Sequence, residues 1–216
     1  HAQGTQNTGK IEAMMKSAEA LSSVQFDATE MDADHYLLNT MSGVVDLRTG
    51  EVHPHGPQWL VSKCSPFHVG REGDKPEKFI KFLLDVCCGD DALAHFIQIM
   101  CGYALTGDVR HQCIFFFYGE GQNGKSQLLN VLRHILGDYA TTDSPDIMLE
   151  GMPRGNPEFR MIRFKGARMF YTAELEQNAT LSMGTIKRIT GSDKMVGRHL
   201  NQGHVEFDPT HKVFFM

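Results

Sequence analysis

The spacing of apolar residues in the first third of the chain predicts a helix followed by a small β-structure. Between residues 11 and 26, apolar side chains recur at helical intervals, which predicts an amphipathic helix. The runs 35–39 and 43–47 predict short strands, and a turn at 48–50 joins the second run to 51–53 as a hairpin. This pattern indicates a mixed N-terminal module.

Two amphipathic helices are predicted after a loop rich in proline and glycine. One apolar face runs through 79–87 and another through 93–104. The residues Gly89-Asp-Asp91 separate them and place an aspartate where it can cap the second helix. We therefore expect a packed helical hairpin.

A continuous apolar run at 113–118 changes the pattern. Such runs are typical of strands covered on both faces, as in a parallel sheet, and a helix predicted at 125–136 follows this one. A second strand is predicted at 168–173, and 212–216 has the pattern of a buried strand. The stretch 141–157, rich in proline, glycine and aspartate, predicts a loop or insert.

The last part of the chain predicts a short helix at 181–190 and a hairpin whose strands, 194–200 and 204–207, flank Asn201-Gln-Gly203. The net charge is −5, but residues 160–200 carry +5 and the remainder carries −10. A local basic surface can neutralise phosphates, although a solvated face fits the charge equally well. The basic residues in this region are Arg160, Arg163, Lys165, Arg168, Lys187, Arg188, Lys194 and Arg198.

Composition excludes several classes of protein. No apolar run is long enough to span a membrane, and the chain does not begin with a secretory signal pattern. The five cysteines are odd in number and lack C-x-x-C spacing, which argues against a disulfide framework and for a reducing compartment. His53 and His55 have no cysteine or carboxylate at zinc-ligand spacing. We expect a soluble, cytoplasmic protein with no membrane partner.

Residues 119–126 fit the pattern G-x-x-x-x-G-K-[ST], between a predicted strand and a predicted helix. Glycines let the backbone wrap around phosphates, and the positive end of the helix favours a bound anion. Lys125 can reach the β- and γ-phosphates of ATP, and the Ser126 hydroxyl can ligate Mg²⁺. The predicted ATP-binding residues are Gly119, Glu120, Gly121, Gln122, Asn123, Gly124, Lys125 and Ser126.

An ATPase with such a loop also needs a carboxylate at the end of a neighbouring strand. The strand predicted at 168–173 ends at Glu174-Leu-Glu176. Glu174, the first acid past the strand, is our candidate for the Mg²⁺-linked carboxylate and general base, and Glu176 is a candidate second acid. Together with Lys125 they form the predicted catalytic set. The alternative interpretation, solvated glutamates at a strand end, fits Glu176 better than Glu174.

The order of these motifs resembles the superfamily 3 helicases, and among them the phage and plasmid primase–helicase family, which is related to poxvirus primase–helicases. The resemblance covers roughly Leu37 to Met216. Besides the loop and the acidic pair, it rests on Ile186-Lys-Arg-Ile-Thr-Gly-Ser-Asp193 and on segments 38–55 and 102–107. It implies an α/β fold with an AAA+-like P-loop ATPase core around a parallel sheet. It also implies a homohexameric ring that hydrolyses Mg-ATP, moves along single-stranded DNA and serves phage or plasmid replication in a bacterial host cytoplasm.

By the same resemblance, the stretch that ends at Asp193 leads into a hairpin facing the central channel of the ring. A basic hairpin can follow a phosphate backbone without reading bases. Packing or solvent exposure is the alternative for each candidate. The implied domains are an N-terminal module (1–75), a helical hairpin (76–110) and an ATPase core (111–216). The candidate DNA contacts are Lys187, Lys194, Arg198, His199 and His204.

The chain departs from the family pattern at several points. Ser192 stands where a second glycine is usual, and the polar sensor and arginine finger would lie beyond the strand at 212–216. We therefore expect a piece of a longer protein, which as a fragment can bind nucleotide and yet hydrolyse it poorly. Two other functions stay open: a P-loop small-molecule kinase and a nucleotide-binding module without turnover.

Overall fold

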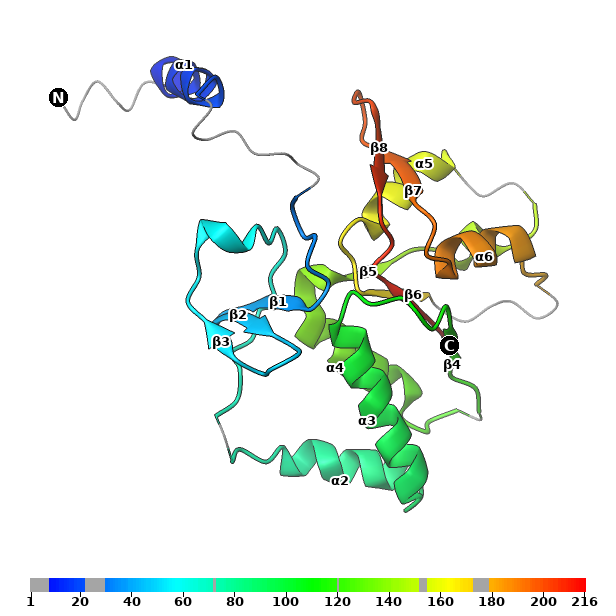
Figure 1. The fold of residues 1–216 in the computed structure, drawn as a ribbon. Helices are drawn as coiled ribbons and strands as arrows, with labels where there is room; N and C mark the ends of the chain where they lie inside the picture. The colour runs from blue at the N-terminus through cyan, green and yellow to red at the C-terminus, as the bar shows by residue number, and fades with distance from the viewer. Residues whose placement is uncertain (1–7, 22–29, 72, 120, 152–154, 173–178) are drawn as a thin grey trace.

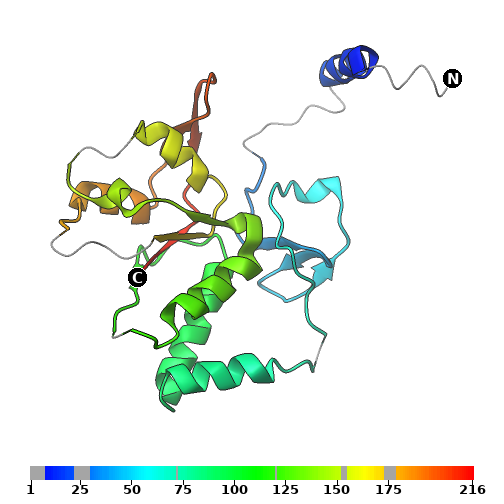
Figure 2. The same cartoon turned by 180° about the vertical axis from the view of Figure 1, so that it is seen from behind.

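The computed structural model describes residues 8–21, 30–71, 73–119, 121–151, 155–172 and 179–216 (Figure 1). The first element is helix α1 (Thr8–Glu19), which is shorter than the helix predicted at 11–26. Every residue of α1 is exposed. In both views the helix stands apart from the rest of the chain (Figures 1 and 2). Its apolar face therefore contributes nothing to the core described below.

A three-stranded antiparallel sheet follows, built from β1 (Leu37–Thr40), β2 (Gly43–Asp46) and β3 (Val52–His53) in sequence order. This confirms the predicted strands and hairpin. Leu38 and Val45 are cross-strand partners, and both are buried. The turn before β2 requires glycine, because Gly43 has φ +140° and a Cβ there would lie 2.2 Å from the His53 carbonyl oxygen.

The predicted helical hairpin is also present, as α2 (Glu77–Val86) and α3 (Asp91–Leu105). Asp90 is the N-cap of α3, because its side chain accepts a hydrogen bond from the Leu93 backbone N–H at 3.0 Å. A short 3-10 turn, η2 (Pro57–Trp59), lies between the small sheet and this hairpin in the chain.

The larger sheet is parallel and contains β4 (Ile114–Phe116), β5 (Ala140–Thr142), β6 (Met169–Thr172) and β9 (Lys212–Phe215). The strand order is β4-β9-β6-β5. The strand nearest the C-terminus therefore lies between the strand that precedes residues 119–126 and the strand that precedes Glu174.

Helix α4 (Lys125–Leu136) covers one face of the parallel sheet (Figure 2). Its leucines at three- and four-residue spacing are buried with Met100 of α3, Leu38 of β1, Met169 and Phe214. Gly137, with φ +53°, ends the helix and leads into η3 (Gly137–Tyr139). One core thus joins the small sheet, the helical hairpin and the parallel sheet.

The opposite face of the sheet is covered by several short elements, around a second cluster that includes Phe164, Phe170, Ile189 and Phe215. These elements are η4 (Pro145–Met148), α5 (Pro157–Met161), η5 (Ile162–Phe164), α6 (Met183–Thr190), and the antiparallel pair β7 (Met195–Arg198) and β8 (His204–Phe207). The helix predicted at 181–190 and the hairpin predicted at 194–207 are confirmed.

Two predictions about the sheet are wrong. The run at 113–118 was expected to be covered on both faces, but β4 is an edge strand, with Phe116 55% and Tyr118 91% exposed. The loop predicted at 141–157 instead begins within strand β5 and continues into η4, where Ile147 and Met148 are buried. Composition misled here because the whole stretch is rich in proline, glycine and aspartate, and η4 itself begins with a proline and an aspartate.

Two cationic side chains fasten the parallel sheet to α3. The Arg168 guanidinium donates hydrogen bonds to the carbonyls of Leu105 and Leu37. The Lys212 ammonium donates to the Thr106 carbonyl, at the end of α3. Both residues are at most 5% exposed. The C-terminal carbonyls of a helix favour nearby positive charge, so these cations are buried where the backbone can compensate them in part.

No helix in the described parts of the chain is both long and apolar enough to cross a membrane.

Candidate nucleotide-binding site

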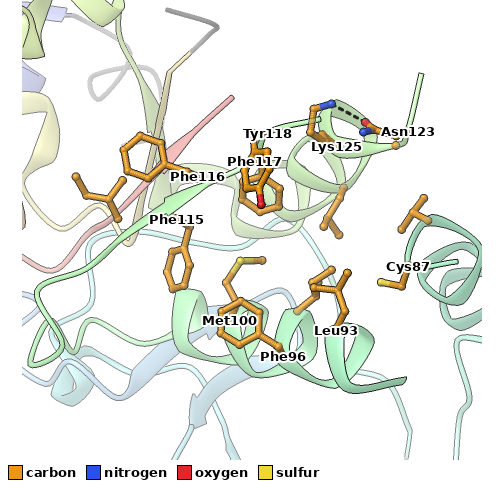
Figure 3. A pocket seen from close by; sticks show the side chains of 15 residues that line it. Cys87, Leu93, Phe96, Met100, Phe115, Phe116, Phe117, Tyr118, Asn123 and Lys125 are labelled. Atoms are coloured by element: carbon orange, nitrogen blue, oxygen red, sulfur yellow. Dashed lines mark hydrogen bonds between the residues drawn. The ribbon is translucent and has the colours of Figure 1, made fainter. Parts of the chain in front are cut away.

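The segment 119–126 lies where β4 ends and α4 begins, at the carboxyl edge of the parallel sheet. In open α/β sheets this edge is where ligands bind. Lys125 folds back over the segment: its ammonium donates to the Gly119 carbonyl at 2.9 Å and to Asn123 Oδ1 at 2.6 Å (Figure 3). The Lys125 ammonium thus joins the first residue of the loop to a side chain near its end.

Two glycines of this loop are required by its geometry. Gly119 has φ +140°, and a Cβ there would lie 2.7 Å from Asn123 Nδ2. Gly124, the N-cap of α4, has φ +81°, and a Cβ there would lie 2.4 Å from Cγ1 of Val86. Because the loop rests directly on α2, the helical hairpin fixes the entry to α4.

The first turn of α4 presents the remaining candidate ligands. Ser126 is exposed there, next to Lys125, and the Leu128 N–H already donates to the Gly124 carbonyl at 2.9 Å. The N–H groups of a helix's first turn have no intrahelical acceptor and attract anions. A hydroxyl at this position is the ligand type that Mg²⁺ accepts beside phosphate oxygens. Glu120 lies outside the described residues.

The predicted acids Glu174 and Glu176 also lie outside the described residues. Thr172 is the last described residue before them, and it aligns with Phe215 of β9, which in turn aligns with Phe116 of β4. Neighbouring strands lie about 4.8 Å apart, so the ends of β4 and β6 are separated by roughly 10 Å along the same edge. The last described residue of β6, Thr172, therefore lies at the same edge of the sheet as the loop.

A cavity of about 520 Å³ opens beside the loop. Its walls are mainly apolar and come from α2, α3, β4 and α4 (Figure 3). Leu93, Phe96 and Met100 face it from α3, while Asn123 and Lys125 close the end next to the loop. Cavities of this size and lining accommodate small organic ligands with a flat apolar part.

The five predicted DNA contacts lie apart from the loop, on the β7–β8 hairpin and α6. Lys187, Lys194 and His199 are exposed. The other two face an acid on α5: Arg198 Nε lies 3.7 Å, and His204 Nδ1 3.6 Å, from the Glu158 carboxylate.

The basic surface predicted for 160–200 is smaller than its charge count implies. Arg160 forms ion pairs with Asp143 at 3.0 Å and Asp146 at 2.7 Å, with its side chain only 12% exposed. Arg168 is buried under α3, as described above. Sequence reasoning missed Glu158, Asp143 and Asp146, because their partners lie 14 to 46 residues away and no local pattern links them.

Comparison with known proteins shows which sequences this chain resembles. Residues 1–88 match the family model described as "D5 N terminal like". The chain is 25% identical over 189 residues to "Putative helicase L207/L206" of Acanthamoeba polyphaga mimivirus, covering 86% of this chain and 20% of that protein. The chain is a distant relative of viral helicase-like proteins. This confirms the kinship with primase–helicases that the motifs led us to expect.

Two further relatives agree with this distant kinship. "Putative helicase V13" of Sputnik virophage is 25% identical over 162 residues, covering 73% of this chain and 18% of that protein. "Putative primase C962R" of African swine fever virus is 22% identical over 206 residues, covering 91% of this chain and 21% of that protein. The chain thus spans about a fifth of the length of the curated relatives it matches.

Among solved structures, the apo C-terminal region of NrS-1 is similar with a TM-score of 0.49 and 18% identity. The match covers 66% of this chain and 33% of that one.

Proposed function

We propose that this chain is the nucleotide-binding core of an ATP-dependent DNA helicase motor. The observation that carries the proposal is the loop at 119–126, held by α2 at the carboxyl edge of a parallel sheet, with Lys125 folded over it. The distant kinship with viral proteins named as helicases supports the same assignment.

In this proposal the loop holds the β- and γ-phosphates of Mg-ATP. The Lys125 ammonium exchanges its contacts with Gly119 and Asn123 for contacts with phosphate oxygens. Its hydrogen bonds become stronger, because the new acceptors are negatively charged and the old ones are neutral. Ser126 would be the protein ligand of Mg²⁺, whose charge would offset the negative charge on the transferred phosphoryl group. Glu174 acts as the general base for the attacking water, and Glu176 as a second acid.

The nucleoside lies in the apolar cavity beside the loop. Asn123 and Lys125 belong to both the loop and the cavity wall, so a ligand whose phosphates occupy the loop has its base within reach of Leu93 and Phe96. The apolar walls would hold the base by packing, while the loop holds the phosphates.

The β7–β8 hairpin is the element that contacts single-stranded DNA. It carries exposed Lys194 and His199, and it projects away from the sheet (Figure 1). Lys187, on α6 next to the hairpin, adds a further positive charge. In the complete protein, a homohexameric ring would bring several such hairpins around one strand, which would let the motor follow the backbone without base readout.

Mg-dependent ATP hydrolysis, measured with and without single-stranded DNA, tests the proposal. We expect turnover that rises with DNA and is lost in Lys125→Ala. Lys78→Ala, the same change on the exposed face of α2, is the matched control and keeps wild-type turnover. Turnover that ignores DNA would favour a small-molecule kinase, and nucleotide binding without turnover would favour a non-catalytic module.

A further inference from the structure

The β7–β8 hairpin is fastened to α5 at its last cross-strand pair. Arg198 and His204 are register partners at the end of the two-stranded ladder. Glu158 of α5 reaches both strands: one carboxylate oxygen lies 3.7 Å from Arg198 Nε and the other 3.6 Å from His204 Nδ1. A single acid therefore bridges the two strands where the ladder gives way to the turn.

Two packing contacts hold the same junction. The Arg198 guanidinium lies over the Phe159 ring, 4.8 Å from its centroid. The backbone of β7 lies directly against η5 at Gly197, which has no side chain. A Cβ at this position would lie only 2.6 Å from the Ile162 nitrogen. Arg198 Nε is buried and has no hydrogen-bond partner among the described residues, and the Glu158 carboxylate, 3.7 Å away, forms an ion pair with it.

The turn beyond this junction is fully exposed. Residues 199–203 form it, with Asn201 at φ +61° and Leu200 74% exposed. The five turn residues include only one side chain that can become cationic, His199. The direction in which they project is therefore set by the junction at Arg198 and His204, and not by contacts of their own with the core.

We propose that Glu158 is the positioning residue of the hairpin, holding Arg198 and His204 against α5 so that the turn at 199–203 meets single-stranded DNA. The inference rests on the proposed function and refines it: Arg198 and His204 act through Glu158 rather than by gripping phosphates. Charge alone argues the opposite, because an acid beside a DNA-binding hairpin lowers affinity by repelling phosphates and masking cations. The two explanations therefore predict opposite changes in DNA affinity when the Glu158 charge is removed.

Glu158→Gln separates them. Its affinity for a fluorescein-labelled oligothymidylate is measured by anisotropy on the full chain. Positioning predicts binding weaker by about two- to five-fold, the factor that corresponds to losing a partly exposed ion-pair contact. The matched control is Glu206→Gln, the same change on β8 of the same hairpin, at an exposed residue that forms no ion pair within the described chain. We expect the control to bind DNA as well as, or better than, the unchanged protein.

The salt dependence of binding and a second variant complete the test. If Glu158→Gln frees Arg198 and His204 to bind phosphates, the slope of log affinity against log salt concentration should steepen by about one to two units, one for each added phosphate contact. If the variant only loses positioning, the slope stays unchanged. Arg198→Gln should weaken binding as much as Glu158→Gln, and the double variant should lose no more than either, since the two residues act as one unit. Thermal melts of each variant verify folding, and Arg198→Gln carries the comparison if Glu158→Gln does not fold.

Each outcome decides the matter. Tighter or unchanged binding by Glu158→Gln, or an additive loss in the double variant, would overturn the positioning role while leaving the helicase proposal intact. An unchanged protein that binds no single-stranded DNA would instead overturn the proposed function, and the positioning role with it.

Discussion

Burial of the Lys212 ammonium links the stability of the fold to pH just above neutrality. The side chain is enclosed between β9 and the end of α3, where it donates to the Thr106 and Asp108 carbonyls and lies over the Tyr103 ring. Burial, together with the neighbouring Arg168 charge, lowers the pKa of Lys212 from 10.5 to about 7. The perturbation to test is Lys212→Met, which keeps a long unbranched side chain and removes its charge.

The sign and size follow from proton linkage. In the folded state Lys212 loses its proton near pH 7, while in the unfolded chain it stays protonated up to about pH 10.5. The unfolded state therefore binds more protons in this window, and the free energy of unfolding rises with pH. Between pH 7 and 8 the increase is about 1 kcal/mol for one such group. Burial also raises the pKa of the Cys101 thiol, to about 11, which would act in the opposite direction only at higher pH.

The assay is urea unfolding at constant ionic strength, at pH values of roughly 7.0, 7.5 and 8.0, the range in which folded Lys212 loses its proton. The unchanged protein should gain about 1 kcal/mol more than Lys212→Met over this range. Burial, aided by the Lys212 charge, lowers the pKa of His211 to about 3. Because burial is the larger cause, His211 stays neutral between pH 7 and 8 in both folded proteins, and its contribution cancels. Parallel profiles for the two proteins would refute the reasoning, because they would mean that Lys212 is not buried as a titrating cation.

Three further predictions test the site and its supports. Gly124→Ala should cost about 1–3 kcal/mol of unfolding free energy and weaken ATP binding, because of its positive φ and the contact with Val86, so Val86→Ala should restore part of the loss in urea titrations. Gly197→Ala should cost a similar amount that no side-chain change relieves, since its Cβ would meet the Ile162 backbone; equal melting temperatures would contradict this. Leu93→Trp should fill the cavity and weaken ATP binding in calorimetry while leaving tripolyphosphate binding unchanged. Equal losses of affinity for the two ligands would contradict the proposal that the base lies in the cavity.

The sequence predicted those features that are encoded locally. The strand and the helix that flank residues 119–126, and the β7–β8 hairpin, carry short-range signals of glycine spacing and alternation, and these elements lie where predicted. Strand β5 was missed because Ala140–Thr142 is only three residues long and carries no apolar alternation. The position of β9 between β4 and β6 depends on pairing between segments about 100 and 43 residues apart, which no local pattern reveals.

The positions of basic residues in the sequence were the poorest guide to which side chains are free to bind a ligand. Arg160 and Arg168 belong to the basic surface predicted from the sequence, yet each is engaged by carboxylates or backbone carbonyls well away in the chain. Arg198 was a candidate DNA contact because of the family resemblance, and its partner Glu158 precedes it by 40 residues. Whether a basic residue is a free binding group or part of a structural ion pair depends on tertiary contacts that its neighbours in the sequence do not specify.

The most direct test of the motor assignment is the dependence of single-stranded DNA affinity on the nucleotide in the loop. Anisotropy titrations of a labelled oligothymidylate, with and without Mg²⁺ and a slowly hydrolysed ATP analogue, measure this coupling without requiring turnover. A motor must bind its track differently in different nucleotide states, so we predict affinities that differ by at least about five-fold and become equal in Lys125→Ala. Identical DNA affinities in the two nucleotide states of the unchanged protein, or no DNA binding in either, would contradict the assignment.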